Sequence, residues 1–353
     1  MKVAILCDSH FGARNDNSFF LEYMLQFYEG IFFPYLQQHD IKTVIHLGDL
    51  MDRRKYVSIK TAKEFRERFM LPINHLKLDF HCLVGNHDIF FKNTNDVNSL
   101  RELIDGRSNK IKIYEDPTEV NIGGLDILFL PWITPQNQIY TEGMIDSTDA
   151  SIVMGHLEIK GFQMYKGIQS DHGIDKSLFS KFQSVFSGHY HHKSDDGQIY
   201  YLGTPYQMTW SDYNCPKGFH VFDTETRELH RIVNPNKIFE KIYYDDTQEN
   251  YDNHDVSQYT NKYVKLVVVN KNDLYKFDKF TDRLFKADCH EVKIIEDFTD
   301  LDANTVSDDI VENSQDTMTL LGKYIDDLDI NLDKTKLKTD ISKLYHEAQD
   351  LEL

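Results

Sequence analysis

The sequence predicts a layered α/β fold with mainly parallel strands in its first part, for two reasons. Short apolar runs of four to seven residues, rich in strand-forming residue types, recur through residues 1–205, and Gly, Asp or Pro follows each of them. Helix-length amphipathic segments separate the first three runs. Alternating strands and helices are typical of a parallel sheet that is covered by helices.

Each apolar run is expected to form a buried strand, because continuous apolar stretches are typical of strands covered on both faces. The runs lie at residues 2–10, 42–49, 80–88, 125–132, 150–158, 183–192 and 198–205. The helical segments cover about residues 17–38 and 57–70, and a closing strand with a hairpin turn is expected at 218–226.

The last third of the chain has a different pattern. Two strand-like runs, a helical segment and a further strand indicate a small separate β–α–β unit, an acidic stretch follows it, and helical periodicity returns afterwards. We therefore predict a main domain over residues 1–230, a small capping domain over 238–297, a linker over 298–317 and a helical tail over 318–353. A chain of 353 residues is long enough for two domains.

Composition narrows the class of protein. The sequence has no run of 18 apolar residues and reaches Asp8 and His10 too early for a signal peptide, so we expect neither a membrane span nor secretion. The four cysteines stand far apart, which favours a reducing compartment over a disulfide framework. We therefore expect a cytoplasmic protein, in the host cytoplasm if a phage encodes it.

The net charge of −18 is an objection to a nucleic-acid-binding role, because such proteins usually carry a basic surface. The charge is uneven: residues 231–353 hold 27 acidic and 16 basic residues, whereas residues 52–68 hold three acidic and seven basic ones. A local basic patch is one interpretation of the second stretch, with Arg53, Arg54 and Lys55 as candidate DNA contacts. A solvated helix face explains it equally well.

Polar side chains with metal-binding chemistry follow five of the predicted strands. Open α/β sheets bind ligands beyond the carboxyl ends of their strands, so we expect these side chains to meet at one edge. Residues i and i+2 of an extended chain face the same side, which pairs Asp8 with His10, pairs His189 with His191 and turns His192 away. The candidate ligands are Asp8, His10, Asp49, Asn86, His156, His189 and His191.

This donor set predicts two-metal hydrolysis. Mixed Asp, Asn and His ligands suit divalent ions such as Mn²⁺, with Mg²⁺, Fe²⁺ or Zn²⁺ as alternatives. Two ions roughly 3.5–4 Å apart activate a water and stabilise the attacking and leaving oxygens of a phosphoryl centre. Each motif alone is common by chance. The prediction rests on all five motifs occurring in order, each at the end of a predicted strand.

The ordered motifs CDSHFG, LGDLMD, VGNHD, MGHLE and SGHYHH resemble the calcineurin-like metallophosphoesterase superfamily. The segments GDLMDRRK, GHLEIKGF and YLGTPYQMTW, followed by KGFHVFDTET, further resemble the nuclease subunits of SbcC–SbcD-type DNA repair complexes, and their phage members most of all. The superfamily motifs cover residues 1–205, and the nuclease-specific resemblance reaches about residue 226. The resemblance implies a two-sheet sandwich flanked by helices, with a small α+β capping domain and C-terminal helices.

The resemblance also implies a role for each site residue. The first cation would be held by Asp8, His10 and His191, the second by Asn86, His156 and His189, and Asp49 would bridge them. His87 would not be a ligand, but a general acid or a charge stabiliser for the leaving 3′ oxygen. Asp88 would orient His87, although a turn-capping role explains it equally well.

Two positions depart from the resembled pattern. Ser9 stands where many members have Trp, which changes a packing contact beside the site. Asp52 stands where some members have a His that is tied to exonuclease action. Because bacterial and phage members also carry Asp at that position, it does not indicate inactivation.

The resemblance implies DNA as substrate and a homodimer within a heterotetramer, in which the C-terminal helices bind the coiled-coil base of an SMC-like ATPase. The tail has apolar stripes at helical spacing, which suit a helix that lies in a partner's groove. The candidate partner contacts are Leu321, Tyr324, Leu328 and Leu344. Packing of these helices on the protein's own core explains the same periodicity.

We therefore hypothesise a Mn²⁺-dependent DNA nuclease that acts as a 3′→5′ exonuclease and a single-strand endonuclease. Two alternatives stay open at this point. One is a metallophosphatase or phosphodiesterase that acts on other substrates, and the other is a non-catalytic scaffold for DNA ends.

Overall fold

The computed structural model describes residues 1–104, 109–165, 168–170 and 172–296, together with the single positions 325, 334, 336 and 337. The chain divides into two compact units. Among the residues described up to 296, the first unit contains those in 1–208, 212–240 and 261–263, and the second contains those in 209–211, 241–260 and 264–296.

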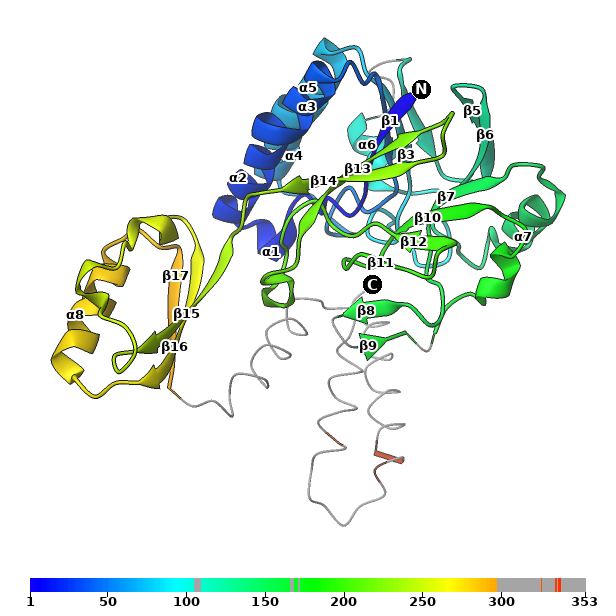
Figure 1. The fold of residues 1–353 in the computed structure, drawn as a ribbon. Coiled ribbons are helices and arrows are strands. Elements are labelled where there is room, and N and C mark those ends of the chain that lie inside the picture. Colours follow the sequence, from blue (N-terminus) through cyan, green and yellow to red (C-terminus); the bar gives the residue numbers. More distant parts are fainter. Residues whose placement is uncertain are drawn as a thin grey trace. The chain divides into compact units, whose positions relative to one another are not determined.

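One six-stranded sheet of the first unit has the order β14-β13-β1-β2-β3-β4 (Figure 1). Its strands are β1 (Lys2–Leu6), β2 (Thr43–His46), β3 (Asp79–Leu83), β4 (Ile111–Tyr114), β13 (Lys217–Asp223) and β14 (Leu229–Asn234). Neighbouring strands from β1 to β4 are parallel, while β13 is antiparallel to both β1 and β14. The carboxyl ends of β1, β2 and β3 therefore lie at the same edge.

The second six-stranded sheet has the order β11-β12-β10-β7-β6-β5. Its strands are β5 (Thr118–Ile122), β6 (Leu125–Leu130), β7 (Ile152–His156), β10 (Ser184–Gly188), β11 (Ser194–Asp195) and β12 (Ile199–Tyr201). Strands β6, β7, β10 and β12 are parallel to their neighbours, and β5 and β11 pair antiparallel at the two edges. A short hairpin, β8 (Gln163–Tyr165) and β9 (Ile168–Gln169), follows β7.

The two sheets share one apolar core. Val3 and Ile5 of β1 belong to the same buried cluster as Phe129 of β6, Met154 of β7 and Phe186 of β10. All five side chains are almost fully removed from solvent. Burial of side chains of this size stabilises a fold by roughly 1.5–3 kcal/mol each, so this shared layer holds the two sheets together.

Helices cover the outer faces of the sandwich. They are α2 (Ser18–Phe27), α3 (Phe33–Gln38), α4 (Ile59–Phe65), α5 (Leu71–His75), α6 (Ser99–Ile104) and α7 (Gln138–Ser147), with the π-helical turns η1 (Tyr28–Phe32) and η2 (Arg66–Met70) and the 3₁₀ turn η3 (Lys176–Phe179). The 3₁₀ turn η4 (Trp210–Asp212) has its first two residues in the second unit and its last in the first. Helices α2 to α5 lie together beside the first sheet (Figure 1). Their buried aromatic side chains, such as Phe27 and Phe69, contact Phe219 of β13 and Phe80 of β3 edge to face.

The segment α1 (Ala13–Asp16) is a left-handed turn rather than an α-helix. Arg14, Asn15 and Asp16 all have φ between 55° and 58°. Left-handed conformations are unfavourable for residues with a side chain, although Asn and Asp tolerate them better than most.

In its described residues up to 296, the second unit is a small sheet covered by the helix α8. Its strands are β15 (Phe239–Asp245), β16 (Tyr263–Asn270) and β17 (Glu291–Ile295), with α8 (Leu274–Phe285) and the 3₁₀ turns η5 (Tyr251–Asn253) and η6 (Ser257–Tyr259). Asp273 caps α8 by accepting a hydrogen bond from the amide of Lys276. Phe277, Phe280 and Leu284 recur at helical spacing and pack into the core of this unit.

The predicted fold class is confirmed: two layered sheets flanked by helices, with an additional small sheet after them. Sequence reasoning missed the edge strands β4, β5 and β11 and the hairpin β8–β9. The predicted boundaries of the main and capping domains stay predictions, and the predicted linker and helical tail lie outside the described residues. Within the part of the chain that the structure describes, no helix is long and apolar enough to cross a membrane.

Candidate metal centre

Loops after five strands bring the predicted ligands together in the first unit. Asp8 and His10 follow β1, Asp49 follows β2 and Asn86 follows β3, all in the first sheet; His156 ends β7, and His189 and His191 follow β10, in the second sheet. The first two loops are held by backbone hydrogen bonds, from Asp8 N to Gly48 O (3.1 Å) and from His10 N to Asp49 O (3.1 Å). The ligands therefore come from the strand ends of two sheets, not from one sheet edge as the sequence reasoning assumed.

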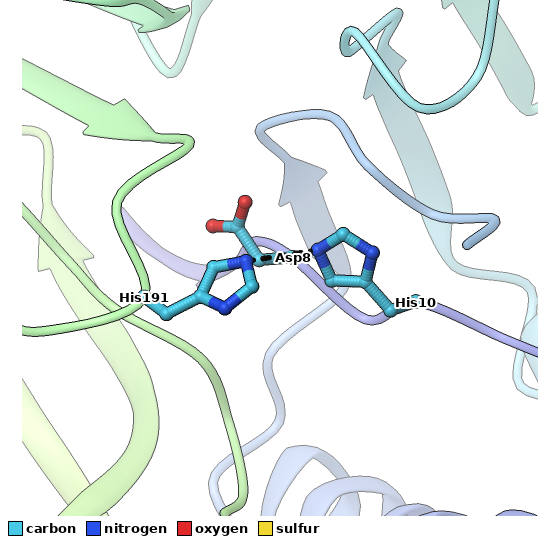
Figure 2. A group of neighbouring side chains, drawn as sticks. All are labelled: Asp8, His10 and His191. Atoms are coloured by element: carbon cyan, nitrogen blue, oxygen red, sulfur yellow. Dashed lines mark hydrogen bonds between the residues drawn. The ribbon is translucent and has the colours of Figure 1, made fainter. Parts of the chain in front are cut away.

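Asp8, His10 and His191 form the first candidate metal group. Their donor atoms lie within 4.8 Å of one another, and Figure 2 shows the three side chains converging from two loops. The Nε2 atoms of His10 and His191 are 3.1 Å apart, so at most one of them can carry a proton between them. Asp8 Oδ2 is buried and has no hydrogen-bond partner among the described residues. Two facing imidazole nitrogens beside an unsatisfied carboxylate oxygen fit a shared cation.

Asp49, His156 and His189 form the second candidate group, with Asn86 between the imidazoles. His156 Nδ1 donates to the carbonyl of Leu47 at 2.7 Å, which leaves Nε2 facing Asn86 Oδ1 at 2.9 Å and Asp49 Oδ2 at 3.3 Å. In the neutral ring a nitrogen lone pair would face two oxygens, an arrangement that needs a proton or a cation. Imidazole ligands are typically oriented in this way, by a backbone carbonyl on the other ring nitrogen.

Asp49 lies between the two groups. Its Oδ2 is 3.3 Å from His156 Nε2 and 3.8 Å from His10 Nε2, while Oδ1 accepts the backbone N–H of His87 at 2.8 Å. One carboxylate oxygen therefore faces ligands of both positions. This geometry suits a bridging ligand.

The buried carboxylates of the site favour a positive charge close to them, which raises the pKa values of two imidazoles. Burial opposes a charged imidazole at His10, but a hydrogen bond to Asp52 and the charges of Asp49, Asp52 and Asp8 outweigh burial and raise the pKa of His10 to about 9. Burial likewise opposes charge on His156, and Asp49 above all raises its pKa to about 9. The buried carboxylates thus favour positive charge on both imidazoles. Divalent cations satisfy the same charge through the neutral rings.

His87 and Asp88 have different surroundings. His87 Nδ1 donates to the carbonyl of Asp52 at 2.5 Å, and its ring meets that of His10 edge on. The buried Asp88 carboxylate accepts the backbone amides of Gly85 and Asp49 at 2.9 Å and of Met51 at 3.0 Å. These bonds tie the loop after β2 to the loop after β3, which supports the turn-holding role for Asp88 rather than the orientation of His87.

Four ligands have backbone conformations that the sequence reasoning did not foresee. Asp8, His10 and Asp49 have φ of 53°, 49° and 54°, and His189 has φ of 86°. The assumption of an extended chain at these positions was therefore wrong. Asp8 and His10 share one group, and His189 and His191 belong to different groups, which is the division that the resemblance implied.

The basic stretch 52–68 is partly neutralised. Arg68 forms ion pairs with Glu22 and Glu29 of the preceding helices, which agrees with a solvated helix face for the second half of the stretch. Arg53 donates to Asn15 and to the hydroxyl of Tyr56. The proposed DNA contacts of Arg53, Arg54 and Lys55 stay predictions, and the guanidinium of Arg53 already has partners within the protein.

Ser9, the first departure from the resembled pattern, is buried in a polar cluster behind the first group. Its hydroxyl is 2.6 Å from Tyr28 OH and 2.7 Å from His46 Nε2, and Tyr206 OH donates to its carbonyl at 2.5 Å. Asp52, the second departure, has Oδ1 3.3 Å from His10 Nδ1. Both residues therefore stabilise the loop that carries Asp8 and His10.

Among the described residues a third candidate metal group consists of His10, Asp49 and His87, and His192 lies in none of the three. It is buried, its Nε2 is 3.5 Å from Asp212 Oδ1, and its Nδ1 is 3.6 Å from Cys215 Sγ. Lys217 pairs with Asp212 at 2.5 Å and donates to the carbonyl of His191 at 2.8 Å. His192 thus belongs to a cluster that supports the ligand loop.

Trp132, which sequence reasoning missed, packs against the second group. Its ring centroid is 5.1 Å from that of His189 and 5.9 Å from that of His156. The signal was present, because Trp132 comes two residues after β6, a further strand that ends near the same site. The predicted partner contacts Leu321, Tyr324, Leu328 and Leu344 lie outside the described residues.

The fold and the donor set define a metal-dependent phosphoesterase, and the chain belongs to the calcineurin-like phosphoesterase family, whose model matches residues 1–193. The family and the converging Asp, Asn and His donors imply divalent metal ions at this centre.

Two curated proteins resemble it further. The chain is 32% identical to exonuclease subunit 1 of Enterobacteria phage T4, over 99% of both chains. It is 24% identical to the SbcD subunit of the SbcCD nuclease of Staphylococcus epidermidis, over 65% of this chain and 67% of that protein. Among solved structures, a dimetal phosphatase from Danio rerio is 12% identical, with a TM-score of 0.43 over 63% of this chain and 91% of that one. That likeness is too weak to support an argument.

Proposed function

We propose that this protein is the nuclease subunit of a DNA-processing complex and hydrolyses phosphodiester bonds with two divalent cations. The observation that carries the proposal is the full-length similarity to a phage exonuclease subunit, in a chain that brings all seven candidate ligands together. Bound cations would activate the attacking water and stabilise charge on the phosphoryl oxygens.

The residues around the cations would position the ligands and supply the proton for the leaving group. Asp49 faces both ligand groups and holds them in one geometry, while Leu47 fixes which nitrogen of His156 faces the site. His87 is anchored at Nδ1 by the Asp52 carbonyl, so its Nε2 is the ring atom that, when the ring is in the doubly protonated imidazolium form, would give a proton to the leaving oxygen. Asp88 clamps the two loops that carry Asp49 and His87.

We further propose Mn²⁺ as the working ion and two activities, a 3′→5′ exonuclease and a single-strand endonuclease. Both curated relatives are named as subunits of nucleases, which supports a multi-subunit assembly for this protein. We propose a homodimer bound to an SMC-like ATPase through residues 318–353, acting in the host cytoplasm. Mixed oxygen and nitrogen donors support Mn²⁺ over ions that prefer thiolates.

A substrate comparison tests the proposal. The full-length protein is incubated with Mn²⁺ and with blunt duplex, 3′-overhang duplex or circular single-stranded DNA, with and without the ATPase partner and ATP. Asp49→Asn, which removes the bridging charge, serves as the inactive control. We expect cleavage of linear and circular DNA by the wild type and none by the variant.

Two outcomes would favour the alternatives. Hydrolysis of a phosphoprotein or a cyclic nucleotide without cleavage of DNA would indicate a phosphatase or phosphodiesterase. Binding of DNA ends without cleavage of any phosphoester would indicate a scaffold. For the partner, removal of residues 318–353 is expected to abolish co-purification with the ATPase and to leave hydrolysis of a simple phosphodiester intact; unchanged co-purification would contradict the proposed docking.

A further inference from the structure

A cavity of about 730 Å³ opens beside the second ligand group of the first unit. Trp132 and the ligand His156 line it, together with residues such as Ile174, Leu178 and Ser180. The volume falls within the range of roughly 300–1,000 Å³ that is typical of small-molecule sites. A ligand in this cavity would therefore adjoin the phosphoryl group held by the metal centre.

Trp132 is held by its backbone rather than by its ring. Its amide donates to Val84 O at 2.8 Å, and its carbonyl accepts from Asn95 Nδ2 at 2.9 Å and from Asn137 Nδ2 at 3.2 Å. The indole is only partly buried, although it contacts the imidazoles of two candidate ligands. A fixed aromatic ring with exposed area is suited to stacking a planar group.

The charge of the cavity selects against phosphate. Carboxylates line it at Glu142, Asp146, Glu158 and Asp175. Among the described residues that line it, Lys181 is the one lysine or arginine, and its ammonium donates to the carbonyls of Asp146 and Thr148 at 2.9 Å. A polyanionic backbone would be repelled here, whereas carboxylates accept hydrogen bonds from the amino groups of a base.

We propose that this cavity receives the nucleobase next to the scissile phosphate, stacked on Trp132, while the phosphate stays at the metal centre. The inference rests on the proposed nuclease function and adds a base-binding site to it. The carboxylate-lined cavity for the base is separate from the metal centre that would hold the phosphate. This separation favours a single, unpaired nucleotide. Single strands are commonly held by such stacking because every base offers a flat face.

Abasic substrates test this directly. Single-stranded oligonucleotides end at the 3′ side in two deoxycytidines, or carry an abasic residue at the terminal or at the penultimate position. For the wild type with Mn²⁺, we expect one of the two abasic substrates to lower kcat/KM by roughly 5- to 150-fold, as stacking on an aromatic side chain gives. Trp132→Ala is expected to cleave that abasic substrate and the natural one at equal rates, and Trp132→Phe to keep part of the preference.

Two further variants separate base binding from damage to the ligands. Ser180→Trp places a bulky side chain at a residue that lines the cavity and is not a candidate ligand, and should also remove the preference for the natural substrate. Tyr140→Ala removes an exposed aromatic side chain of α7 that does not line the cavity, and should keep the wild-type ratio.

The outcomes distinguish the inference from the function on which it rests. A wild-type ratio in Trp132→Ala, or no effect of either abasic position in the wild type, would overturn the base site while the nuclease stands. Hydrolysis of bis(p-nitrophenyl) phosphate without cleavage of any oligonucleotide would overturn the nuclease itself.

Discussion

Replacing His87 with alanine tests the division between ligands and proton donor. Because His87 lies in a candidate metal group with His10 and Asp49, proximity alone allows it to be a ligand. Its Nδ1 donates to the Asp52 carbonyl just as that of the candidate ligand His156 donates to Leu47, so this bond does not decide the role; its backbone amide, which the alanine variant keeps, donates to Asp49 Oδ1. From the proposed role, we expect His87→Ala to bind two cations and to lose the group that protonates the leaving oxygen.

The size of the loss follows from that role. A positioned general acid contributes roughly 10²–10⁴-fold to a rate, which corresponds to about 2.7–5.4 kcal/mol of transition-state stabilisation. We expect kcat for DNA to fall by this factor, since the Asp49 geometry is retained. The fall should be much smaller for bis(p-nitrophenyl) phosphate, because p-nitrophenolate leaves without needing a proton. A charge stabiliser would lower both rates alike.

The assay combines steady-state kinetics on both substrates with metal analysis of the purified variant by mass spectrometry. His10→Ala is the matched control, because it removes a predicted ligand of the first group and should leave one tightly bound cation. A single cation in His87→Ala would refute the reasoning and make His87 a ligand. Equal losses on both substrates would refute the proton-donor role alone.

Three further predictions concern stability. Chelation of divalent cations should lower Tm, since saturation at 100 times Kd stabilises by about 2.7 kcal/mol, and an unchanged calorimetric Tm would contradict the metal centre. Asp88→Asn should cost about 2–4 kcal/mol in urea unfolding, because its carboxylate accepts several buried amides, whereas the exposed Asp149→Asn should change little; equal effects would count against the clamp. Burial, aided by Arg231, lowers the pKa of His220 to about 3, so the unfolded chain binds a proton that the folded one excludes. Stability should fall as pH drops below about 6.5, by up to about 1.4 kcal/mol per unit, and His220→Leu should lessen the slope; parallel curves would argue otherwise.

The sequence predicts this fold well where a strand is buried on both faces. Strands such as β1, β2 and β7 are continuous apolar runs, and the structure contains each of them. Strand β4, with the sequence IKIY, and strand β5, TEVNI, lie at sheet edges and are only partly buried, so their apolar residues are few and their pattern is weak. Partial burial thus explains why these edge strands were missed.

The metal-ligand residues of the site could be predicted from the sequence, but the groups that orient and hold them could not. Asp, Asn and His after strand ends can be recognised from residue type and order. The carbonyl of Leu47, which orients His156, leaves no trace in the sequence, because any residue offers a carbonyl. The ion pairs of Arg68 were equally hidden, since Glu22 and Glu29 become its neighbours only when the helices pack.

The glycines of the motifs have a reason that the sequence pattern alone does not reveal. Glycine permits tight turns, and Gly48 does have φ of 93°. A Cβ at Gly48 would also lie 2.6 Å from Nδ1 of His156, and one at Gly85 would lie 2.2 Å from Oδ1 of Asp49. Neither contact is sterically allowed. The glycines are therefore required because the ligand loops approach one another closely, and not only because the chain turns.

The ligand residues with a left-handed backbone conformation also show that backbone geometry restricts the residue types at the site. A strained backbone conformation costs roughly 1–3 kcal/mol and persists only where the surrounding structure enforces it. Asp8, His10, Asp49 and His189 are all in this region, and Asp and His are among the non-glycine residues that tolerate it best. Metal chemistry and backbone geometry thus select the same residue types. A substitution by another ligand type, such as Glu for Asp49, would therefore fail on conformation as well as on reach.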